Sequence, residues 1–336
     1  MTKDLEIEPQ RHFVTGGAGF IGSHLVERLL AAGKHVTVYD NLASGRLSWI
    51  ERHLGNPAFR FERADLLNAD RLTEEMANHD LVWHLGANTD IPSGCEDVNL
   101  DLRNCVLATH NTLEAMRRNG IRKIIFSSTS AVYGEAPVSP TPETAGPLRP
   151  ISLYGAAKLS CEALVSSYCH LFGLQAWMFR FANVIGARMG HGVIFDFIQK
   201  LRRAPRRLEV WGDGKQRKPF FLVEDCIDGM VCAFRRSDDW CDVFNLGCDT
   251  TTGVDRVAEI VIEEMGLPEV EVQHTGGRRG FPGDVPVLML DAGKMETLGW
   301  RARHTSDEAV RIAARRLLGK EQPAAVGSAS GGATAP

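Results

Sequence analysis

The chain lacks several features that would assign it to a common class of protein. No apolar run approaches the roughly 20 residues that a membrane-spanning helix needs. The opening MTKDLEIEPQ is also too acidic and too polar for a signal peptide. The 38 lysines and arginines are scattered rather than gathered into a stripe, and the formal net charge is −4. We therefore expect a cytoplasmic protein with no membrane partner and no nucleic-acid partner.

The cysteines give no sign of a metal site. None of the eight belongs to a Cys-x-x-Cys pair, and none has a histidine at the spacing of a zinc finger. In a reducing compartment such cysteines are expected to be small buried hydrophobic residues. No metal is therefore expected.

What the chain does contain is an α/β pattern. Residues 11–127 alternate between β-rich and helical runs, which is typical of strand–helix–strand units around a parallel sheet. The expected strands carry RHFVTG, HVTVYD, FRFERAD, LVWHLGA and KIIFSS. A chain of 336 residues, 44% of them hydrophobic, suits one large domain or two unequal lobes. Residues 321–336 are small, polar and Pro-containing, so we expect disorder there.

A glycine-rich turn joins the first expected strand to a helix. Gly16, Gly19 and Gly22 permit a tight turn, close approach of the backbone to a pyrophosphate, and free N–H groups at the helix N-terminus. The next strand ends in Asp40, whose carboxylate can accept hydrogen bonds from ribose hydroxyls and repels a 2′-phosphate. This predicts a dinucleotide site that favours NAD over NADP. Asp65, after the third strand, either accepts from the adenine amino group or caps a helix.

Tyr154 and Lys158 lie four residues apart in the helical run SLYGAAKLS, so both belong to one helix face. A nearby ammonium, and the positive nicotinamide ring of bound NAD, both favour the phenolate and make Tyr154 a plausible base. Thr129 follows the strand KIIFSS and is expected at the mouth of the sheet. Its neighbours Ser128 and Ser130 are alternatives for the same role.

Four motifs together resemble a known family. TGGAGFIG, HLGA at 84–87, SSTSAVYG at 127–134 and YGAAK at 154–158 are similar to the extended short-chain dehydrogenase/reductase superfamily, in its nucleotide-sugar epimerase branch, over residues 11–318. The resemblance implies that Tyr154 is the acid/base, that Lys158 lowers its pKa and holds the nicotinamide ribose, and that Thr129 bonds the reacting oxygen.

The resemblance also implies a fold and a cofactor. The expected fold is a Rossmann-type doubly wound parallel sheet over residues 11–180, with a smaller C-terminal substrate-binding lobe over 181–320, some segments of which return to the sheet. A homodimer is expected. The cofactor is expected to be NAD, held by Gly16, Gly19, Phe20, Ile21, Gly22, Asp40, Asn41, Asp65, Leu66, Leu85, Ala87 and Lys158.

The residues after Thr129 narrow the reaction. Dehydratases of the superfamily carry Asp-Glu at the positions of Ser130 and Ala131, and decarboxylases usually carry Glu at the second. The favoured function is therefore a redox-neutral 4-epimerase that passes through a 4-keto sugar, acting on UDP-glucose/UDP-galactose or UDP-glucuronate. The alternatives are another nucleotide-sugar oxidoreductase, a decarboxylase or a dehydratase of the superfamily. A non-catalytic module that senses NAD is a further alternative.

The second half of the chain is expected to bind the nucleotide sugar. Asn183 in RFANVIG is a candidate for the diphosphate or sugar, whereas Arg180 is a structural candidate. Lys218 stands where the family usually has Arg, and Arg279 is the stronger pyrophosphate candidate, with Arg278 as its rival. The remaining candidates are apolar: Val193, Ile194 and Phe197 either cover the base or belong to the core, and Leu288 is expected beside the sugar's C2 substituent.

Overall fold

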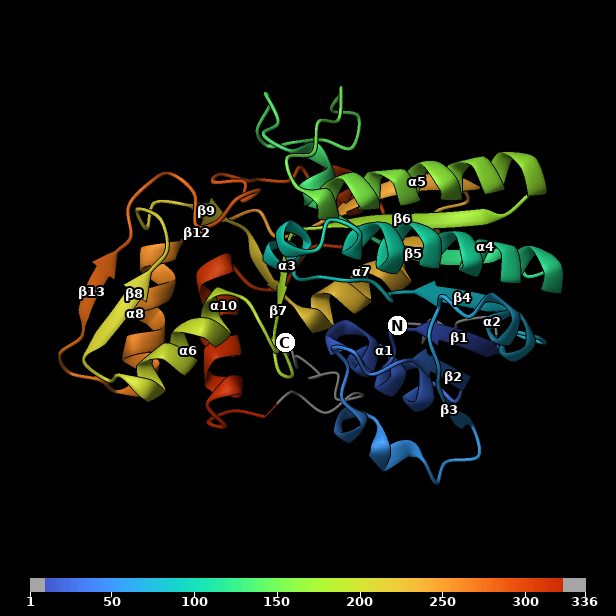
Figure 1. Cartoon of the computed structure of the whole chain (residues 1–336), viewed down its shortest axis with the longest axis horizontal. Coiled ribbons are helices and arrows are strands. Elements are labelled where there is room, and N and C mark those ends of the chain that lie inside the picture. The colour runs from blue at the N-terminus through green and yellow to red at the C-terminus, as the bar shows by residue number, and fades with distance from the viewer. Residues whose placement is uncertain (1–9, 323–336) are drawn as a thin grey trace, which may run out of the picture.

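The computed structural model describes residues 10–322 and is built around a seven-stranded sheet (Figure 1). All its pairings are parallel, and the strand order is β11-β6-β5-β4-β1-β2-β3. The order reverses between β1 and β4, which creates the crevice where such sheets bind ligands. The predicted Rossmann-type fold is therefore confirmed, with strands β1 (Arg11–Thr15), β2 (His35–Asp40), β3 (Phe59–Arg63), β4 (Leu81–His84), β5 (Lys123–Thr129), β6 (Gln175–Phe181) and β11 (Cys241–Leu246).

The central strands are apolar on both faces because helices cover both sides of the sheet. Successive residues belong to different cores: Phe13 packs with one cluster and Val14 with the other, and both are fully buried. Helices α1 (Phe20–Ala31) and α7 (Val223–Arg236) cover one face, as Figure 1 shows. The other face is covered by α2 (Ala69–Glu75), α4 (Ala108–Asn119) and α5 (Leu153–Phe172).

Helix α5 has clear start and stop signals. The Ser152 hydroxyl accepts a hydrogen bond from the backbone N–H of Gly155 at 3.1 Å, which satisfies one free donor of the first turn. Gly173 ends the helix with a φ of 68°, a conformation that glycine adopts readily. The helix therefore begins just before Tyr154 and carries it close to the carboxyl end of β5.

A second group of elements lies beside the sheet, at the left of Figure 1. A third core cluster joins helices α6 (Val193–Arg203), α8 (Val254–Met265) and α10 (Ser306–Leu317). Three short strand pairs complete this group: β7 (Asn183–Ile185) with β10 (Phe220–Leu222), β8 (Arg207–Val210) with β13 (Glu271–His274), and β9 (Arg217–Lys218) with β12 (Thr252–Gly253). The boundary predicted at 180/181 falls inside β6 and stays a prediction.

Short helical pieces connect these elements. They are η1 (Leu47–Trp49), η2 (Glu51–His53), α3 (Ile91–Glu96), the π-helical η3 (Leu102–Leu107), η4 (Ser130–Tyr133) and α9 (Gly293–Thr297). Among residues 10–322, no helix is both long and apolar enough to cross a membrane. The disorder expected over 321–336 lies almost entirely outside the described residues.

Candidate active site

The glycine-rich turn between β1 and α1 is fixed by close backbone contacts. Gly16 has a φ of 69°, and a Cβ atom there would lie 2.7 Å from the backbone nitrogen of Gly86. A Cβ on Gly22 would lie 2.2 Å from the carbonyl oxygen of Gly16. Gly19 is the N-cap of α1, so the unpaired N–H groups of the first turn open at this point. A residue with a side chain does not fit at position 16 or 22 without a shift of the backbone.

Asp40 lies beside that turn, at the end of β2. Its carboxylate accepts hydrogen bonds from the backbone N–H groups of Ala18 at 3.0 Å and Leu42 at 2.8 Å. The side chain is almost entirely buried, and burial raises the pKa of its carboxyl group. The nearby cation Arg46 donates its backbone N–H to Ala18, and its guanidinium lies over the ring of Trp49 at 5.4 Å.

Asp65 lies next to Asn41 across the same edge of the sheet. The Asn41 side-chain amide donates to the Asp65 carboxylate at 2.9 Å, and the backbone N–H of Leu67 donates to its other oxygen at 2.9 Å. The N-cap of α2 is Asn68, which accepts from the N–H of Arg71. The alternative that Asp65 caps this helix is therefore wrong, and its predicted adenine contact stays a prediction.

These groups fit a dinucleotide. The turn offers N–H groups with no Cβ in the way, and Asp40 offers a carboxylate beside it. The other predicted cofactor residues lie along the same carboxyl edge: Phe20 and Ile21 are in the first turn of α1, Leu66 follows β3, and Leu85 and Ala87 follow β4.

Lys158 is fixed under the carboxyl end of β5. Its ammonium donates to the carbonyl oxygen of Ser127 at 2.7 Å and lies 4.9 Å from the centre of the Phe126 ring. The residue is 3% exposed. Tyr154 is one turn earlier on the same helix, and the side chain of Thr129 acts to lower the pKa of its phenol.

The pKa of Tyr154 differs from the sequence-based expectation. Burial raises it above its ordinary value, and electrostatic interaction with Cys105 and Asp101 raises it further, whereas the side chain of Thr129 acts to lower it. The protein groups alone therefore do not produce the lowered pKa that the sequence predicts.

The structure separates Thr129 from its two serine alternatives. The Ser128 hydroxyl is buried and donates to Glu162, so it faces the core. Ser130 begins η4, and Thr129 is the N-cap that accepts from the N–H of Ala131 at 3.2 Å. Of the three, Thr129 is the residue whose side chain acts on the pKa of Tyr154.

Arg180 lies in the core, as expected for a residue with a structural role. Its guanidinium pairs with both Glu162 oxygens, at 3.0 and 2.7 Å, and it lies over the Tyr133 ring at 4.7 Å.

His84 of the HLGA motif is also internal, between the hydroxyls of Thr15 at 2.8 Å and Thr109 at 3.0 Å. Burial and the charge of Lys158 lower the pKa of His84 to about 3, so its ring is neutral.

The candidate substrate residues divide into two groups. The Asn183 side-chain amide is buried without a hydrogen-bond partner among the described residues, as expected for a group that awaits a ligand. Ile194 and Phe197 point into the third core cluster and are 0% and 4% exposed, so their side chains belong to the core. Val193 packs against that cluster but keeps exposed surface.

The candidate cations are already paired. Lys218 forms an ion pair with Asp284, whose side chain is only 4% exposed. Arg279 donates to the backbone oxygen of Asp284 and to the Glu135 carboxylate, the latter at 2.9 Å. Sequence reasoning did not predict these acidic partners. Asp284 is 66 residues from Lys218 in the sequence, and Glu135 is 144 residues from Arg279.

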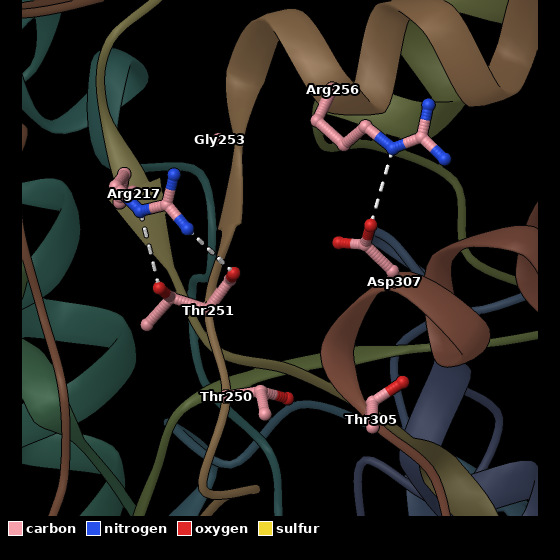
Figure 2. A pocket seen from close by; sticks show the side chains of 7 residues that line it. All are labelled: Arg217, Thr250, Thr251, Gly253, Arg256, Thr305 and Asp307. Carbon is pink, nitrogen blue, oxygen red and sulfur yellow. Dashed lines mark hydrogen bonds and ion pairs between the residues drawn. The ribbon is translucent and has the colours of Figure 1, made fainter.

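Two cavities have linings that do not include Tyr154. Leu288 and Arg278 line a cavity of 170 Å³ between the segments 134–141 and 286–289. A larger depression of 360 Å³, shown in Figure 2, contains none of the predicted site residues. It is lined by Arg217, Thr250, Thr251, Gly253, Arg256, Thr305 and Asp307.

Sequence reasoning also missed a polar pair next to the segment that packs against α5. Asn88, directly after the HLGA motif, donates its side-chain amide to the buried carboxylate of Asp101 at 2.9 Å. Asn88 could have been singled out from the sequence, because it directly follows the HLGA motif. Nothing in the local sequence singles out Asp101.

Comparison with known proteins identifies the family. The model of the NAD dependent epimerase/dehydratase family matches residues 12–247. The chain belongs to this family. The putative UDP-glucose 4-epimerase of Methanocaldococcus jannaschii is 33% identical over 305 residues, covering 89% of this chain and 95% of that protein. The UDP-glucose 4-epimerase of Mycolicibacterium smegmatis is 31% identical over 320 residues, covering 93% and 100%.

Solved structures of the NAD dependent epimerase/dehydratase family share the whole fold. A crystal structure of UDP-galactose 4-epimerase is 38% identical with a TM-score of 0.83, covering 92% of this chain and 99% of that one. The family also includes other activities: UDP-glucuronic acid decarboxylase 4 of Arabidopsis thaliana is 33% identical over 87% of this chain. The cofactor is NAD, and the enzyme class is established at the level of the family.

Proposed function

We propose that the protein is an NAD-dependent nucleotide-sugar 4-epimerase whose reaction is redox-neutral overall. The observation that carries the proposal is the buried ammonium of Lys158, which is fixed at the end of β5 where Thr129 lies and is one turn of α5 from Tyr154. No carboxylate follows Thr129, since the next residues are Ser130 and Ala131. One acid/base group is enough to oxidise a hydroxyl and to reverse that oxidation.

Each residue has a defined task in this reaction. Tyr154 accepts the proton of the C4 hydroxyl and later returns it. Thr129 donates a hydrogen bond to the reacting oxygen, and Lys158 supplies a fixed positive charge that favours the phenolate. NAD, held by the turn at Gly16–Gly22 and by Asp40, would supply the hydride acceptor for C4 and the hydride for its return. The 4-keto sugar presents its opposite face before the return, so the configuration at C4 is inverted.

The proposed substrates are UDP-glucose/UDP-galactose or UDP-glucuronate. The names of similar proteins support this choice, because several are UDP-glucose or UDP-galactose 4-epimerases. A dehydratase or decarboxylase needs a further acid/base group, for which residues 130 and 131 offer no carboxylate. A homodimer and a cytoplasmic location, both expected from the sequence, belong to the same proposal; light scattering of the purified protein tests the former.

The test is to incubate the protein with each UDP-sugar, separate the isomers by chromatography and follow the absorbance of reduced cofactor. The expected result is isomerisation without steady release of NADH. Tyr154→Phe should lower turnover by at least about a hundredfold, the usual contribution of a general base.

The matched control is Tyr168→Phe, which removes a hydroxyl from the same helix. That hydroxyl donates to Glu114 at 2.7 Å, far along α5 from Tyr154. Its loss should change turnover less than about threefold, since it touches no reacting group. Net oxidation, a product that has lost water or carbon dioxide, or full activity of Tyr154→Phe would each contradict the proposal.

A further inference from the structure

The larger depression, shown in Figure 2, opens on the other side of β9 from the residue predicted to meet the substrate. Arg217 lines it, whereas the next residue of the strand, Lys218, is not part of the lining and pairs with Asp284. Successive side chains of a strand point to opposite sides, which explains the separation. The depression has a volume of 360 Å³, within the range of about 300–1,000 Å³ that small-molecule sites occupy. Because six of its seven lining residues have polar or charged side chains, it suits a polar ligand.

Arg217 is held in a fixed position, but its charge is not balanced. Its Nε donates to the Thr251 hydroxyl at 3.3 Å, and its Nη2 donates to the Thr251 carbonyl oxygen at 3.1 Å (Figure 2). Among residues 10–322, no carboxylate pairs with this guanidinium, and neither its Nη1 nor the hydrogen of the Thr251 hydroxyl has an acceptor. Nη1 lies near Gly253, where a Cβ atom would be 3.7 Å away. Two donors, one of them charged, are therefore available to a ligand in the depression.

Asp307 supplies the opposite kind of group on the facing side of the depression, as Figure 2 shows. Its Oδ1 accepts from the Thr252 hydroxyl at 2.6 Å, and its Oδ2 accepts from the Nε of Arg256 at 3.2 Å. The side chain is 48% exposed, and each carboxylate oxygen can accept a further hydrogen bond. Arg256 also pairs with Glu259 and Glu263, so this side of the depression has no positive charge left for an anion.

The two sides therefore require a ligand with two different ends. On the Arg217 side, a phosphate group has several oxygens that can accept from the guanidinium and from the Thr251 hydroxyl together. On the Asp307 side, a second anionic group would be repelled, whereas a neutral hydroxyl can donate to the carboxylate. Asp307 already has a cation as a partner, so it needs no ammonium group from the ligand. A phosphorylated sugar combines these features, with a phosphate at one end and hydroxyls over the rest.

We propose that this depression is a second binding site of the protein and that it takes a sugar phosphate. Arg217 and Thr251 bind the phosphate, and Asp307 accepts a hydrogen bond from a hydroxyl of the sugar. None of the lining residues is a predicted catalytic, cofactor-binding or substrate-binding residue. The inference therefore goes beyond the proposed function and does not depend on it.

The test measures binding to the purified holoenzyme by isothermal titration calorimetry. The three probes are glucose 1-phosphate, inorganic phosphate and glucose. Glucose 1-phosphate should bind at least about tenfold more tightly than inorganic phosphate, because it alone reaches both sides of the depression. Glucose should also bind more weakly than glucose 1-phosphate, since it lacks the charged group that Arg217 requires.

Arg217→Ala and Lys218→Ala form a matched pair, because these neighbouring cations lie on opposite sides of β9. Arg217→Ala should weaken the binding of glucose 1-phosphate and of inorganic phosphate by at least about tenfold, the usual size of a charged hydrogen bond. Lys218→Ala should leave both affinities unchanged. Thr251→Val keeps the size of the side chain and should weaken both by about threefold, which tests the site even if Arg217→Ala does not fold.

Asp307→Asn separates the two ends of the ligand, because the amide keeps the shape of the side chain but not its charge. Glucose 1-phosphate should bind about threefold more weakly, since a neutral acceptor bonds a hydroxyl less strongly. Inorganic phosphate should bind more tightly, since the repulsion by the carboxylate is gone. Arg206→Ala is the control for general charge, because Arg206 is exposed and does not line the depression. It should change neither affinity.

The inference is supported if the Arg217 and Asp307 variants behave in this way and the Lys218 and Arg206 variants bind normally. It is overturned if glucose 1-phosphate does not bind, if Lys218→Ala weakens its binding instead of Arg217→Ala, or if Arg206→Ala is as damaging as Arg217→Ala. Equal affinities for inorganic phosphate and glucose 1-phosphate would also overturn it, because the depression would then hold an anion alone. These measurements need no turnover, so a fully active Tyr154→Phe enzyme would remove the proposed function and leave this inference standing.

Discussion

The predicted cofactor side and the predicted substrate side of the site differ in the groups they offer to a ligand. On the cofactor side, the groups predicted to meet the ligand are backbone N–H groups and Asp40, whose own hydrogen-bond partners are backbone N–H groups. On the substrate side, the candidate cations Lys218 and Arg279 are both held by acids of the chain. A site built from backbone is complete before its ligand binds. In a site built from long side chains, the cations can form ion pairs with acids of the same chain. A diphosphate would then have to compete with those carboxylates for the cations.

The largest effect should come from the cofactor side. In Gly22→Ala, the new Cβ would lie 2.2 Å from a backbone oxygen that cannot move away. We expect loss of the NAD that remains bound on purification and destabilisation of about 3 kcal/mol or more. Cofactor content after denaturation and thermal unfolding measure the two effects. The control is Gly55→Ala, which meets nothing within 4 Å and should change neither.

Asp40 should govern the choice between NAD and NADP. Its buried carboxylate repels a 2′-phosphate, so NADP should bind at least about a hundredfold more weakly than NAD. Asp40→Ser should reduce that ratio by about tenfold, measured by titration of the cofactor-free protein. Asp80→Asn is a matched control, since Asp80 also accepts from two backbone N–H groups, at 2.9 and 3.0 Å, but at the other end of β1. An unchanged ratio in Asp40→Ser would remove Asp40 from the recognition of ribose.

The substrate side should respond more weakly. If Lys218 leaves Asp284 to meet a phosphate, Lys218→Ala should raise KM for the UDP-sugar by about tenfold and leave kcat nearly unchanged. Arg217→Ala is the control, because this neighbouring cation bonds Thr251 on the other side of the strand (Figure 2). Equal effects in both variants would mean that only general charge is involved.

The smallest effect concerns the sugar's C2 substituent. Leu288 is predicted to favour a 2-hydroxyl over an N-acetyl group, with kcat/KM values that differ by about tenfold. Leu288→Ala should narrow that ratio, whereas Val287→Ala, at a residue that is 58% exposed, should not. Because Leu288 is 8% exposed and packs in the core, its truncation should also cost about 2–4 kcal/mol of stability. An unchanged ratio would confine Leu288 to a packing role.

The cofactor half was largely predictable from sequence. The reason is that its features depend on residues that are close together in the sequence. The glycine turn, Asp40 and the Tyr154–Lys158 pair are each set by spacing within one strand, turn or helix. The strand order then follows from the rules of parallel sheets, which leave few arrangements for alternating strands and helices. These features of the protein were determined by the sequence itself.

Tertiary structure alone decided the rest. The pairing of Lys218 with Asp284, the burial of Ile194 and Phe197, and the raised pKa of Tyr154 all depend on segments brought together by folding. Asp101 is the clearest case, because its partner Asn88 follows another strand and its charge acts on a third segment, α5. Local patterns determine which backbone geometry forms, whereas burial and long-range charge determine what each side chain does there.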